Sequence, residues 1–178
     1  LNKFKTSLIK DMQFFEKKWL DIDEGKDSIS LDKWVKKHVS NTCEDLILQM
    51  DIEGAEYRNI ISSSETLLKR FRIIVIELHH LENLLLNKNE NQIELLLKKL
   101  NKTHICIHAH PNNCCGELID NETGMNIPRV IELTYLRRDR FLNKKLSINN
   151  AIPNPNDISA NLLTRRPLHL NKNWFNPK

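Results

Sequence analysis

Two short apolar segments separated by a helical stretch limit what this chain can fold into. The segments are "EDLILQMDI" and "FRIIVIELHHL", and "GAEYRNIISSSETLLKRF" lies between them with helical character, interrupted at its serine run. The second segment is rich in β-branched residues, which favour strands. Strands separated by a helix form right-handed units with parallel pairing. Residues 45–52 and 72–78 therefore predict neighbouring parallel strands of an α/β sheet, and the first is apolar on both sides at its centre, as buried parallel strands are.

Other elements follow from the same kind of pattern. Residues 1–20 have apolar side chains at mostly helical spacing, which predicts an amphipathic helix. A second helix begins at about Leu31 with Ser30 as its N-cap, and a third carries an apolar face after residue 90. Residues 103–110 alternate and 128–137 form a further strand. No helix separates these two strands, so we expect antiparallel neighbours joined by the Gly116–Pro128 stretch.

Size and charge exclude several classes of protein. The 178 residues suffice for one domain with a core, and 28% charged residues is an ordinary share for a globular protein. A net charge of +4, spread along the chain, is too weak to argue for nucleic acid. No apolar run approaches the length of a membrane span, and no signal peptide is visible. The four cysteines lack a scaffold spacing, and adjacent Cys114 and Cys115 do not easily bridge, so reduced thiols in the cytoplasm are expected.

Acidic residues come directly after both central strands. Asp51 and Glu53 follow the first strand, and Glu77 and His79 end the second. In open α/β sheets ligands bind beyond the carboxyl ends of the strands, so these four groups are candidate catalytic residues. Crowded carboxylates hold a cation or act as a base, and Gly54 allows a sharp turn or a close approach of backbone to ligand. An alternative stays open, in which Asp51 caps the next helix and the acids of its first turn favour the helix dipole.

The same residues carry a family resemblance. "LQMDIEGAEY", followed by "RIIVIELHHL", resembles the FkbM-type methyltransferases, a class I family that depends on S-adenosylmethionine. The likeness continues in "KLNKTHICIHAHPNN", "IPRVIELTYLRRDRF" and "RRPLHLNKNWF", and spans roughly residues 29–175. It implies a Rossmann-like seven-stranded sheet in which Asp51 ends the fourth strand and Glu77 the fifth. The strands at 103–110 and 128–137 become the sixth and the antiparallel seventh, with the seventh between the fifth and sixth.

One departure from the family pattern limits that resemblance. Such enzymes hold the cofactor with a glycine-rich turn after the first strand, and the four glycines here form no G-x-G cluster. We therefore expect residues 1–142 to be the carboxyl-terminal portion of a methyltransferase domain, with an excerpted or processed start at Leu1. Residues 143–178, rich in Asn and Pro, are expected to form an arm that packs on the domain. Asp51 and Gly54 are the residues expected to bind the cofactor.

The stretch "HICIHAHPNNCCG" has two interpretations. On an alternating strand His104, Cys106, His108 and His110 would share one face, and such a set could ligate zinc, although its thiols lack the usual spacing. The resemblance implies instead that the strand end faces a polar acceptor such as a sugar. A polar strand end with Asn in turns is equally open. The residues expected to bind this acceptor are His110, Asn112, Asn113 and Glu132. For Glu132, a strand-end His or Arg129 is the expected partner, and an unpaired position at the edge is the alternative.

Two functions of different classes remain at this point. The first is an S-adenosylmethionine-dependent enzyme that methylates a hydroxyl of a saccharide or similar small acceptor, with Asp51 or His79 as base. A divalent cation held by Asp51, Glu53 and Glu77 is the alternative to a base. The second function is a degenerate domain that serves as a binding or assembly module. A homodimer could complete the missing part of a cofactor site.

Overall fold

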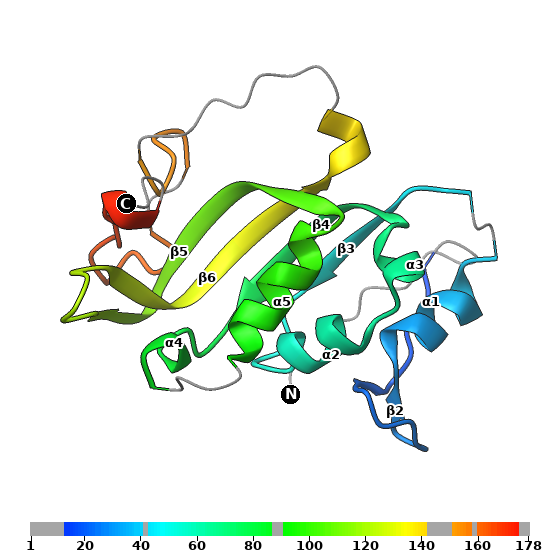
Figure 1. Ribbon diagram of the computed structural model, residues 1–178. Helices are drawn as coiled ribbons and strands as arrows, with labels where there is room; N and C mark the ends of the chain where they lie inside the picture. Colours follow the sequence, from blue (N-terminus) through cyan, green and yellow to red (C-terminus); the bar gives the residue numbers. More distant parts are fainter. Residues whose placement is uncertain (1–12, 41–42, 87–90, 142–150, 158–159, 175–178) are drawn as a thin grey trace.

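The computed structural model describes residues 13–40, 43–86, 91–141, 151–157 and 160–174 (Figure 1). Its elements form a small two-stranded sheet, a four-stranded sheet and short helices. In chain order they are β1 (Trp19–Leu20), β2 (Ser28–Ile29), α1 (Leu31–His38), β3 (Leu46–Met50), α2 (Glu56–Ser62), α3 (Glu65–Leu68), β4 (Phe71–Leu78), α4 (Asn83–Leu86), α5 (Gln92–Asn101), β5 (His104–Ile119), β6 (Asn126–Arg137) and two 3-10 turns at Arg138–Phe141 and Lys172–Trp174.

The larger sheet has the strand order β3-β4-β6-β5. β3 and β4 pair in parallel, and β6 is antiparallel to both β4 and β5. The predicted parallel pair, the antiparallel closing hairpin and the mixed α/β class are thereby confirmed. The last strand lies between β4 and β5, which is the position expected for it from the family resemblance.

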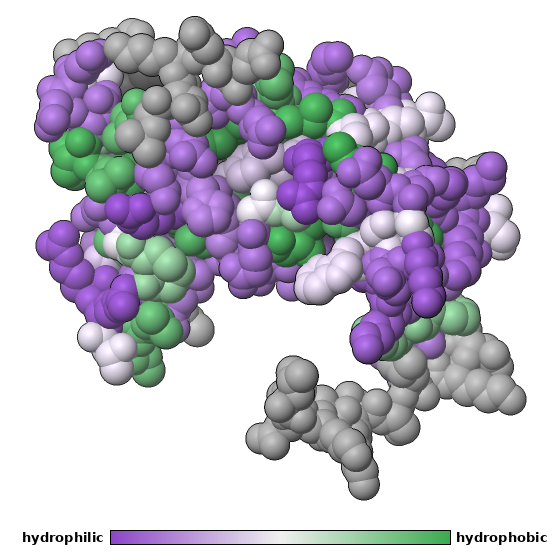
Figure 2. All heavy atoms as spheres, turned by 90° about the horizontal axis from the view of Figure 1, so that it is seen from below, coloured by the Kyte–Doolittle hydropathy of each residue, from purple (hydrophilic) through white to green (hydrophobic). Residues whose placement is uncertain are grey.

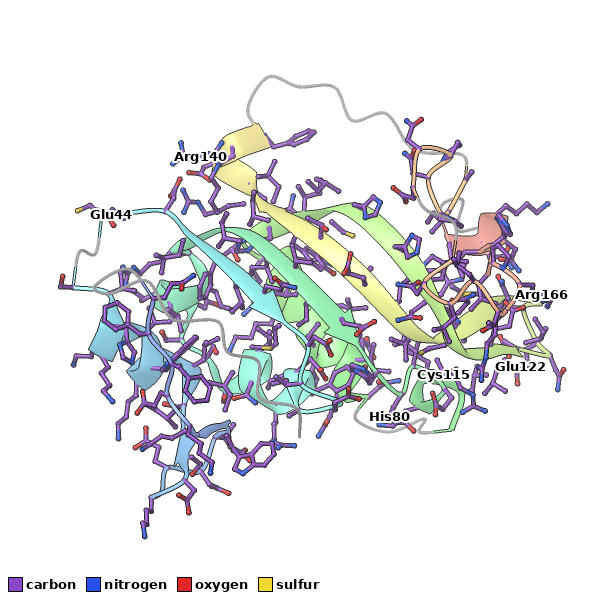
Figure 3. All side chains as sticks on the ribbon, turned by 180° about the vertical axis from the view of Figure 1, so that it is seen from behind. Glu44, His80, Cys115, Glu122, Arg140 and Arg166 are labelled. Carbon is purple, nitrogen blue, oxygen red and sulfur yellow. The ribbon has the colours of Figure 1, made fainter. Side chains whose placement is uncertain are left out.

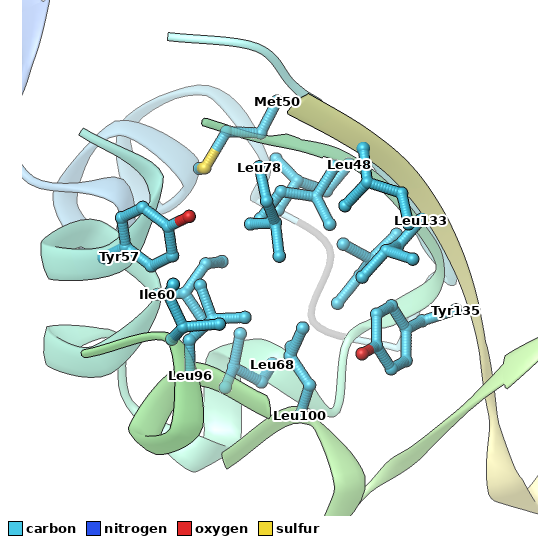
Figure 4. Packing of buried hydrophobic residues seen from close by; sticks show 14 of the residues in the cluster. Leu48, Met50, Tyr57, Ile60, Leu68, Leu78, Leu96, Leu100, Leu133 and Tyr135 are labelled. Atoms are coloured by element: carbon cyan, nitrogen blue, oxygen red, sulfur yellow. The ribbon is translucent and has the colours of Figure 1, made fainter. Parts of the chain in front are cut away.

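The core lies between the sheet and the helices on one of its faces. Helices α2 and α5 pack there, and Leu48, Leu78 and Tyr135 reach them from three strands (Figures 1 and 4). Helix α5 contributes its predicted apolar face, of which Ile93, Leu96 and Leu100 are buried. Each fully buried large apolar side chain contributes about 1.5–3 kcal/mol relative to an exposed one. The packing of α2 and α5 against the sheet therefore fixes the positions of the carboxyl ends of β3 and β4.

The expectation that β3 is buried on both sides is wrong. Leu48 and Met50 face the core, but Ile47 on the other face is 70% exposed and Gln49 is exposed as well. β3 is an edge strand among the described residues, and it pairs only with β4. No described helix covers this face of the sheet when it is seen from behind (Figure 3).

Local signals fixed two of the predicted helices and failed for a third. Ser30 caps α1 by accepting from the Lys33 N–H, and Ser64 caps α3 after the predicted interruption of the serine run. The helix expected over residues 1–20 is wrong for residues 13–20. These residues are not helical, because Trp19 and Leu20 pair with Ser28 and Ile29 instead. Residues 1–12 lie outside the described part of the chain.

The closing hairpin is longer than predicted. β5 continues to Ile119 and β6 begins at Asn126, so most of the stretch expected as a connection is strand. Asp120 organises the remaining turn by accepting hydrogen bonds from the Glu122 and Thr123 N–H groups. Pro128 sits inside β6, where it pairs with Glu117 beyond the last residue of β4. A strand proline is tolerated there because β4 no longer needs its missing N–H.

The described parts of the carboxyl-terminal arm, residues 151–157 and 160–174, contact the hairpin. Asn126 is the main anchor, since its side chain donates to the His169 carbonyl and accepts from the Asn171 N–H. The Trp174 indole donates to the Asn126 carbonyl, and Phe175, the next residue, lies outside the described residues. Within the described helices, none has the length and apolar character that a membrane crossing requires.

Candidate active site at the carboxyl ends of β3 and β4

The turn between β3 and α2 is held by a buried carboxylate. Glu56 is fully buried, and its two oxygens accept from the Ile52 and Gly54 N–H groups at 2.8 Å each. Glu53 and Gly54 both have positive φ, 56° and 99°, a conformation that glycine adopts readily and glutamate rarely. The residue before α2 is Ala55, without a side-chain cap. The interpretation of Asp51 as a helix cap is therefore wrong, because Glu56 stabilises the turn from within.

Glu56 also orients His79. Its Oε1 lies 3.2 Å from His79 Nδ1, and His79 itself is 9% exposed. Two backbone N–H groups already donate to this carboxylate, so its oxygens are acceptors and Nδ1 is the donor. The Tyr57 hydroxyl donates to the His79 carbonyl, and burial, followed by the charge of Glu56, raises the pKa of Tyr57. His79 is thus fixed at both its ring and its backbone, with Nε2 left as the acceptor nitrogen.

The Nε2 atom of His79 faces the acids predicted to converge. It lies 3.8 Å from Asp51 Oδ1, 3.5 Å from Glu53 Oε2 and 3.8 Å from Glu77 Oε2. Asp51 and Glu53 are exposed, with 54% and 86% of their side chains accessible, whereas Glu77 is half-buried. Parallel pairing of β3 and β4 explains the convergence, because both strands end at the same edge of the sheet.

Three of these groups have the spacing of metal ligands. One atom each from Asp51, Glu77 and His79 lies within 4.8 Å of the others, and this is the only such group found among the described residues. Carboxylate and imidazole ligands suit a divalent cation. A metal-bound histidine commonly donates its other N–H to a carboxylate, which is what His79 does toward Glu56. The donor set therefore fits a divalent cation as well as it fits a free base.

A row of polar side chains runs from this site across the sheet. This polar row consists of Glu77, Asn112, Glu132 and His110. Asn112 donates from Nδ2 to Glu77 Oε1 at 2.8 Å. Glu77 pairs in register with Glu132, and Glu132 pairs with His110. Directly paired residues on neighbouring strands share a face, so Glu77, Glu132 and His110 lie side by side on the face away from the core. Seen from below, where β3 and β4 end, the surface is largely hydrophilic (Figure 2).

The far end of the row meets the carboxyl-terminal arm. His108 Nε2 lies 2.8 Å from Asp157 Oδ2, and His110 Nδ1 lies 3.6 Å from the same oxygen. Burial opposes ionisation of Asp157, but the hydrogen bond from His108 and its charge lower the pKa of this carboxyl overall. The His110 Nε2 contacts Asn161 Oδ1 at 3.2 Å. Together with Glu132 and Ala160, these residues line a hollow of about 420 Å³.

Two expectations about this region need correction. A bulge between Cys106 and His108 reverses the alternation, so His104 and Cys106 lie on one face and His108 and His110 on the other. The set proposed for zinc is therefore split. Arg129 pairs with Glu82 Oε1 at 2.8 Å and not with Glu132.

Asn113 is separated from the other predicted acceptor residues. It is 2% exposed, and its amide donates to the Leu162 carbonyl while its oxygen accepts from the Leu162 N–H. The side chain is used to hold the arm. Of the four residues expected to bind an acceptor, the structure brings His110, Asn112 and Glu132 to one face and assigns Asn113 to the arm.

A second hollow borders β3 on its free edge. It encloses about 220 Å³ beside Leu48, Met50 and Ile52, with Trp34 and Leu31 contributed by α1. Most of its lining residues are apolar, and Glu16, Lys18 and Gln49 are its polar members. The volume falls below that of a typical site for a complete small ligand. Two of its lining residues, Met50 and Ile52, flank Asp51 in the sequence.

Two central residues of the site were not predicted from the sequence. The sequence pattern indicates Glu56 only as an acid of a first helical turn, whereas in the structure this residue, six positions after the last residue of β3, closes the turn. Asp157 lies 49 residues after His108, and no local pattern connects them. Both act through hydrogen bonds that depend on the folded chain.

Comparison with known proteins gives one match. Residues 21–103 match the family model of the methyltransferase FkbM domain. Neither the comparison with curated proteins nor that with solved structures found a match. The matched segment runs from before β2 to the start of β5 and contains Glu56, His79 and the acids around them. The family resemblance is therefore confirmed for residues 21–103.

Proposed function

We propose that this chain takes part in S-adenosylmethionine-dependent O-methylation of a saccharide or similar small polar acceptor, with His79 as the base. The observation that carries the proposal is the pair formed by buried Glu56 and His79 Nδ1, at 3.2 Å. A histidine oriented by a buried carboxylate accepts a proton at its other nitrogen and is stabilised when it becomes charged. The family match over residues 21–103 supports the reaction class.

The acceptor residues follow from the polar row. A hydroxyl placed near His79 Nε2 would give its proton to that atom as the new bond forms. Asn112 and Glu77, already joined by a hydrogen bond, would orient the neighbouring part of the acceptor. Glu132 and His110 extend the same face and suit further hydroxyl groups. Positioning of this kind is the main contribution that methyl transfer requires of the protein.

S-adenosylmethionine, when bound, supplies a methyl group on a positively charged sulfonium. Asp51 and Gly54 would border it at the end of β3, and the apolar hollow beside Trp34 would cover part of its nucleoside. The acids around His79 attract such a cation. The sequence contains no G-x-G turn, so we propose that polypeptide other than residues 1–178 completes the cofactor site.

A divalent cation at Asp51, Glu77 and His79 is the alternative arrangement of the same site. A cation bound there would lower the pKa of an acceptor hydroxyl, and His79 would then act as ligand and not as base. Manganese titration followed by electron paramagnetic resonance separates the two arrangements. Binding that is lost in Asp51→Asn and Glu77→Gln but kept in Glu122→Gln supports the ligand role. Absence of binding in a folded sample leaves His79 as the base.

A second candidate function is a non-catalytic assembly module. The free edge of β3 and the exposed Ile47 favour it, because unpaired strand edges recruit additional strands. Calorimetric titration of S-adenosylhomocysteine into this chain, with and without magnesium, separates the two functions. Micromolar binding that weakens in Asp51→Asn supports the methyltransferase. A folded sample without binding, alone and together with any polypeptide that pairs with β3, would overturn it in favour of the module.

A further inference from the structure

An adjacent pair of cysteines protrudes from the sheet beside the polar row. Asn112 pairs with Val130 and Glu117 pairs with Pro128, so residues 113–116 stand opposite Arg129 alone. This wide bulge carries Cys114 and Cys115 out of the regular ladder. Gly116 completes it with a φ of 77°, and a side chain added there would meet nothing within 4 Å. Figure 3 shows Cys115 at the end of the sheet at which His80 follows β4.

The bulge brings the two sulfur atoms together. Cys114 Sγ and Cys115 Sγ are 2.8 Å apart, although cysteines adjacent in sequence were not expected to bridge easily. In a regular strand neighbouring side chains point to opposite faces, so this approach depends on the bulge. Cys115 is exposed and Cys114 is half-buried, while Cys106 lies near the start of the same strand and Cys43 precedes β3. Both sulfurs are therefore placed for reaction with one another and with a small reagent from solvent.

We propose that Cys114 and Cys115 form a reversible disulfide with a peroxide as oxidant. The exposed Cys115 thiolate attacks one peroxide oxygen, which breaks the O–O bond and, after protonation, gives a sulfenic acid and water. The Cys114 sulfur then attacks the sulfur of that sulfenic acid, forms the S–S bond and releases a second water. Two thiols are oxidised and one hydrogen peroxide is reduced to two waters.

The order of these steps follows from the surroundings of the two thiols. Burial, followed by the hydrogen bond to Cys115, raises the pKa of the Cys114 thiol to about 12. Cys114 is thus a poor first nucleophile, and exposed Cys115 reacts with peroxide before it. Once Cys115 is a sulfenic acid, the short distance between the two sulfur atoms favours attack by Cys114, although the Cys114 thiol is only weakly acidic.

The pair adjoins two residues with known contacts. The Cys114 N–H donates to Asn112 Oδ1, and Asn112 holds Glu77. Asn113, directly before the pair, holds the arm at Leu162. Ring closure between adjacent residues alters the backbone of both, so oxidation changes the segment that joins the polar row to the arm. The modification is chemically independent of methyl transfer.

The test uses the full chain in a Cys43→Ser, Cys106→Ser background, where Cys114 and Cys115 are the remaining thiols. The reduced protein is treated with a small excess of hydrogen peroxide and analysed by intact mass spectrometry. We expect the monomer to lose two hydrogen atoms and to lose both sites of iodoacetamide labelling, and dithiothreitol to restore both. The further variant Cys114→Ser is expected to gain oxygen at Cys115 instead.

Three results would overturn the proposal. The first is stepwise gain of oxygen at Cys115 while Cys114 stays labelled by iodoacetamide. The second is a disulfide-linked dimer in place of the monomer, and the third is no reaction of a folded sample. A circular dichroism spectrum matching that of the unsubstituted chain establishes that the background variant is folded. Since mass is the readout, failure of this proposal is distinguishable from failure of the methyltransferase proposal.

Discussion

The carboxylate of Glu56 and the Nδ1 atom of His79 form a buried contact of 3.2 Å beneath three acids. Glu56→Gln replaces one acceptor oxygen by an NH₂ group, which faces a donor whichever way the amide is turned. We expect a loss of about 1–3 kcal/mol in the free energy of unfolding, from a buried donor left without an acceptor. Urea unfolding measures this loss. Nitrogen-15 NMR of His79 should also show a larger share of the tautomer protonated at Nε2.

The matched control for Glu56 is Glu53→Gln. Glu53 lies in the same turn, but 86% of its side chain is accessible and its contact with His79 is at the surface. We expect a change within about 0.5 kcal/mol. Equal losses in the two variants would show that charge in the turn, and not the buried hydrogen bonds, stabilises it.

Gly54 supports a separate prediction about the turn. Gly54→Ala adds a methyl group at a φ of 99°, and the new Cβ would lie 3.1 Å from His80 Cδ2. The positive φ costs about 1–2 kcal/mol, and the contact requires His80 to shift. Gly116→Ala and Gly124→Ala are controls with positive φ and open space around the added atom. If thermal denaturation shows the same loss for all three, the His80 contact has no measurable effect.

The carboxylate of Glu132 should lower the free energy of unfolding. It is exposed on β6 and stands directly opposite Glu77, a like-charged cross-strand pair. Removing the charge in Glu132→Gln should stabilise the fold by about 0.2–1 kcal/mol in low salt, and by less in high salt because ions screen the repulsion. Chemical unfolding at two ionic strengths tests this, with Glu122→Gln in the hairpin turn as control. A destabilised Glu132→Gln would mean that the carboxylate has a favourable contact in the folded chain.

His104 makes stability depend on pH. The ring is fully buried, its Nε2 lies 2.9 Å from the Phe71 carbonyl, and burial lowers the pKa of His104 despite that hydrogen bond. The unfolded chain takes up a proton at about pH 6.5 and the folded chain only at lower pH. This contribution to stability is therefore present above about pH 6.5 and is lost as the pH falls toward the folded value. Urea midpoints at about pH 8 and about pH 5.5 should differ more in the unsubstituted chain than in His104→Gln. Identical differences would remove His104 as the cause.

Local patterns predicted the framework of this fold well. The apolar runs located β3 and β4, and their end at one edge followed from the intervening helix, so the approach of Asp51, Glu53 and Glu77 to His79 could be anticipated. The open face of β3 could not, because Ile47 is as apolar as a buried strand residue. Whether such a side chain is covered depends on the rest of the fold.

Backbone irregularities and long-range contacts explain most of the site features that could not be predicted from the sequence. The bulge after Cys106 changes the face of every histidine that follows, and no residue in that stretch signals it. Asn113 and Asp157 have polar side chains that could bind either a ligand or another part of the protein. Only their long-range partners, Leu162 and His108, show which of the two applies.

The residues at the two ends of the polar row come from different parts of the chain, and this has a consequence for how the sequence can change. Glu56, His79 and the acids around them belong to the segment β3–α2–β4, whereas Asp157, Ala160 and Asn161 come from the arm, more than seventy residues later in the chain. Substitutions in the arm reshape the hollow at His108 and His110 without touching the Glu56–His79 pair. Under the proposed function, acceptor selectivity and base chemistry would therefore be encoded in separate stretches of sequence, and either could change without the other.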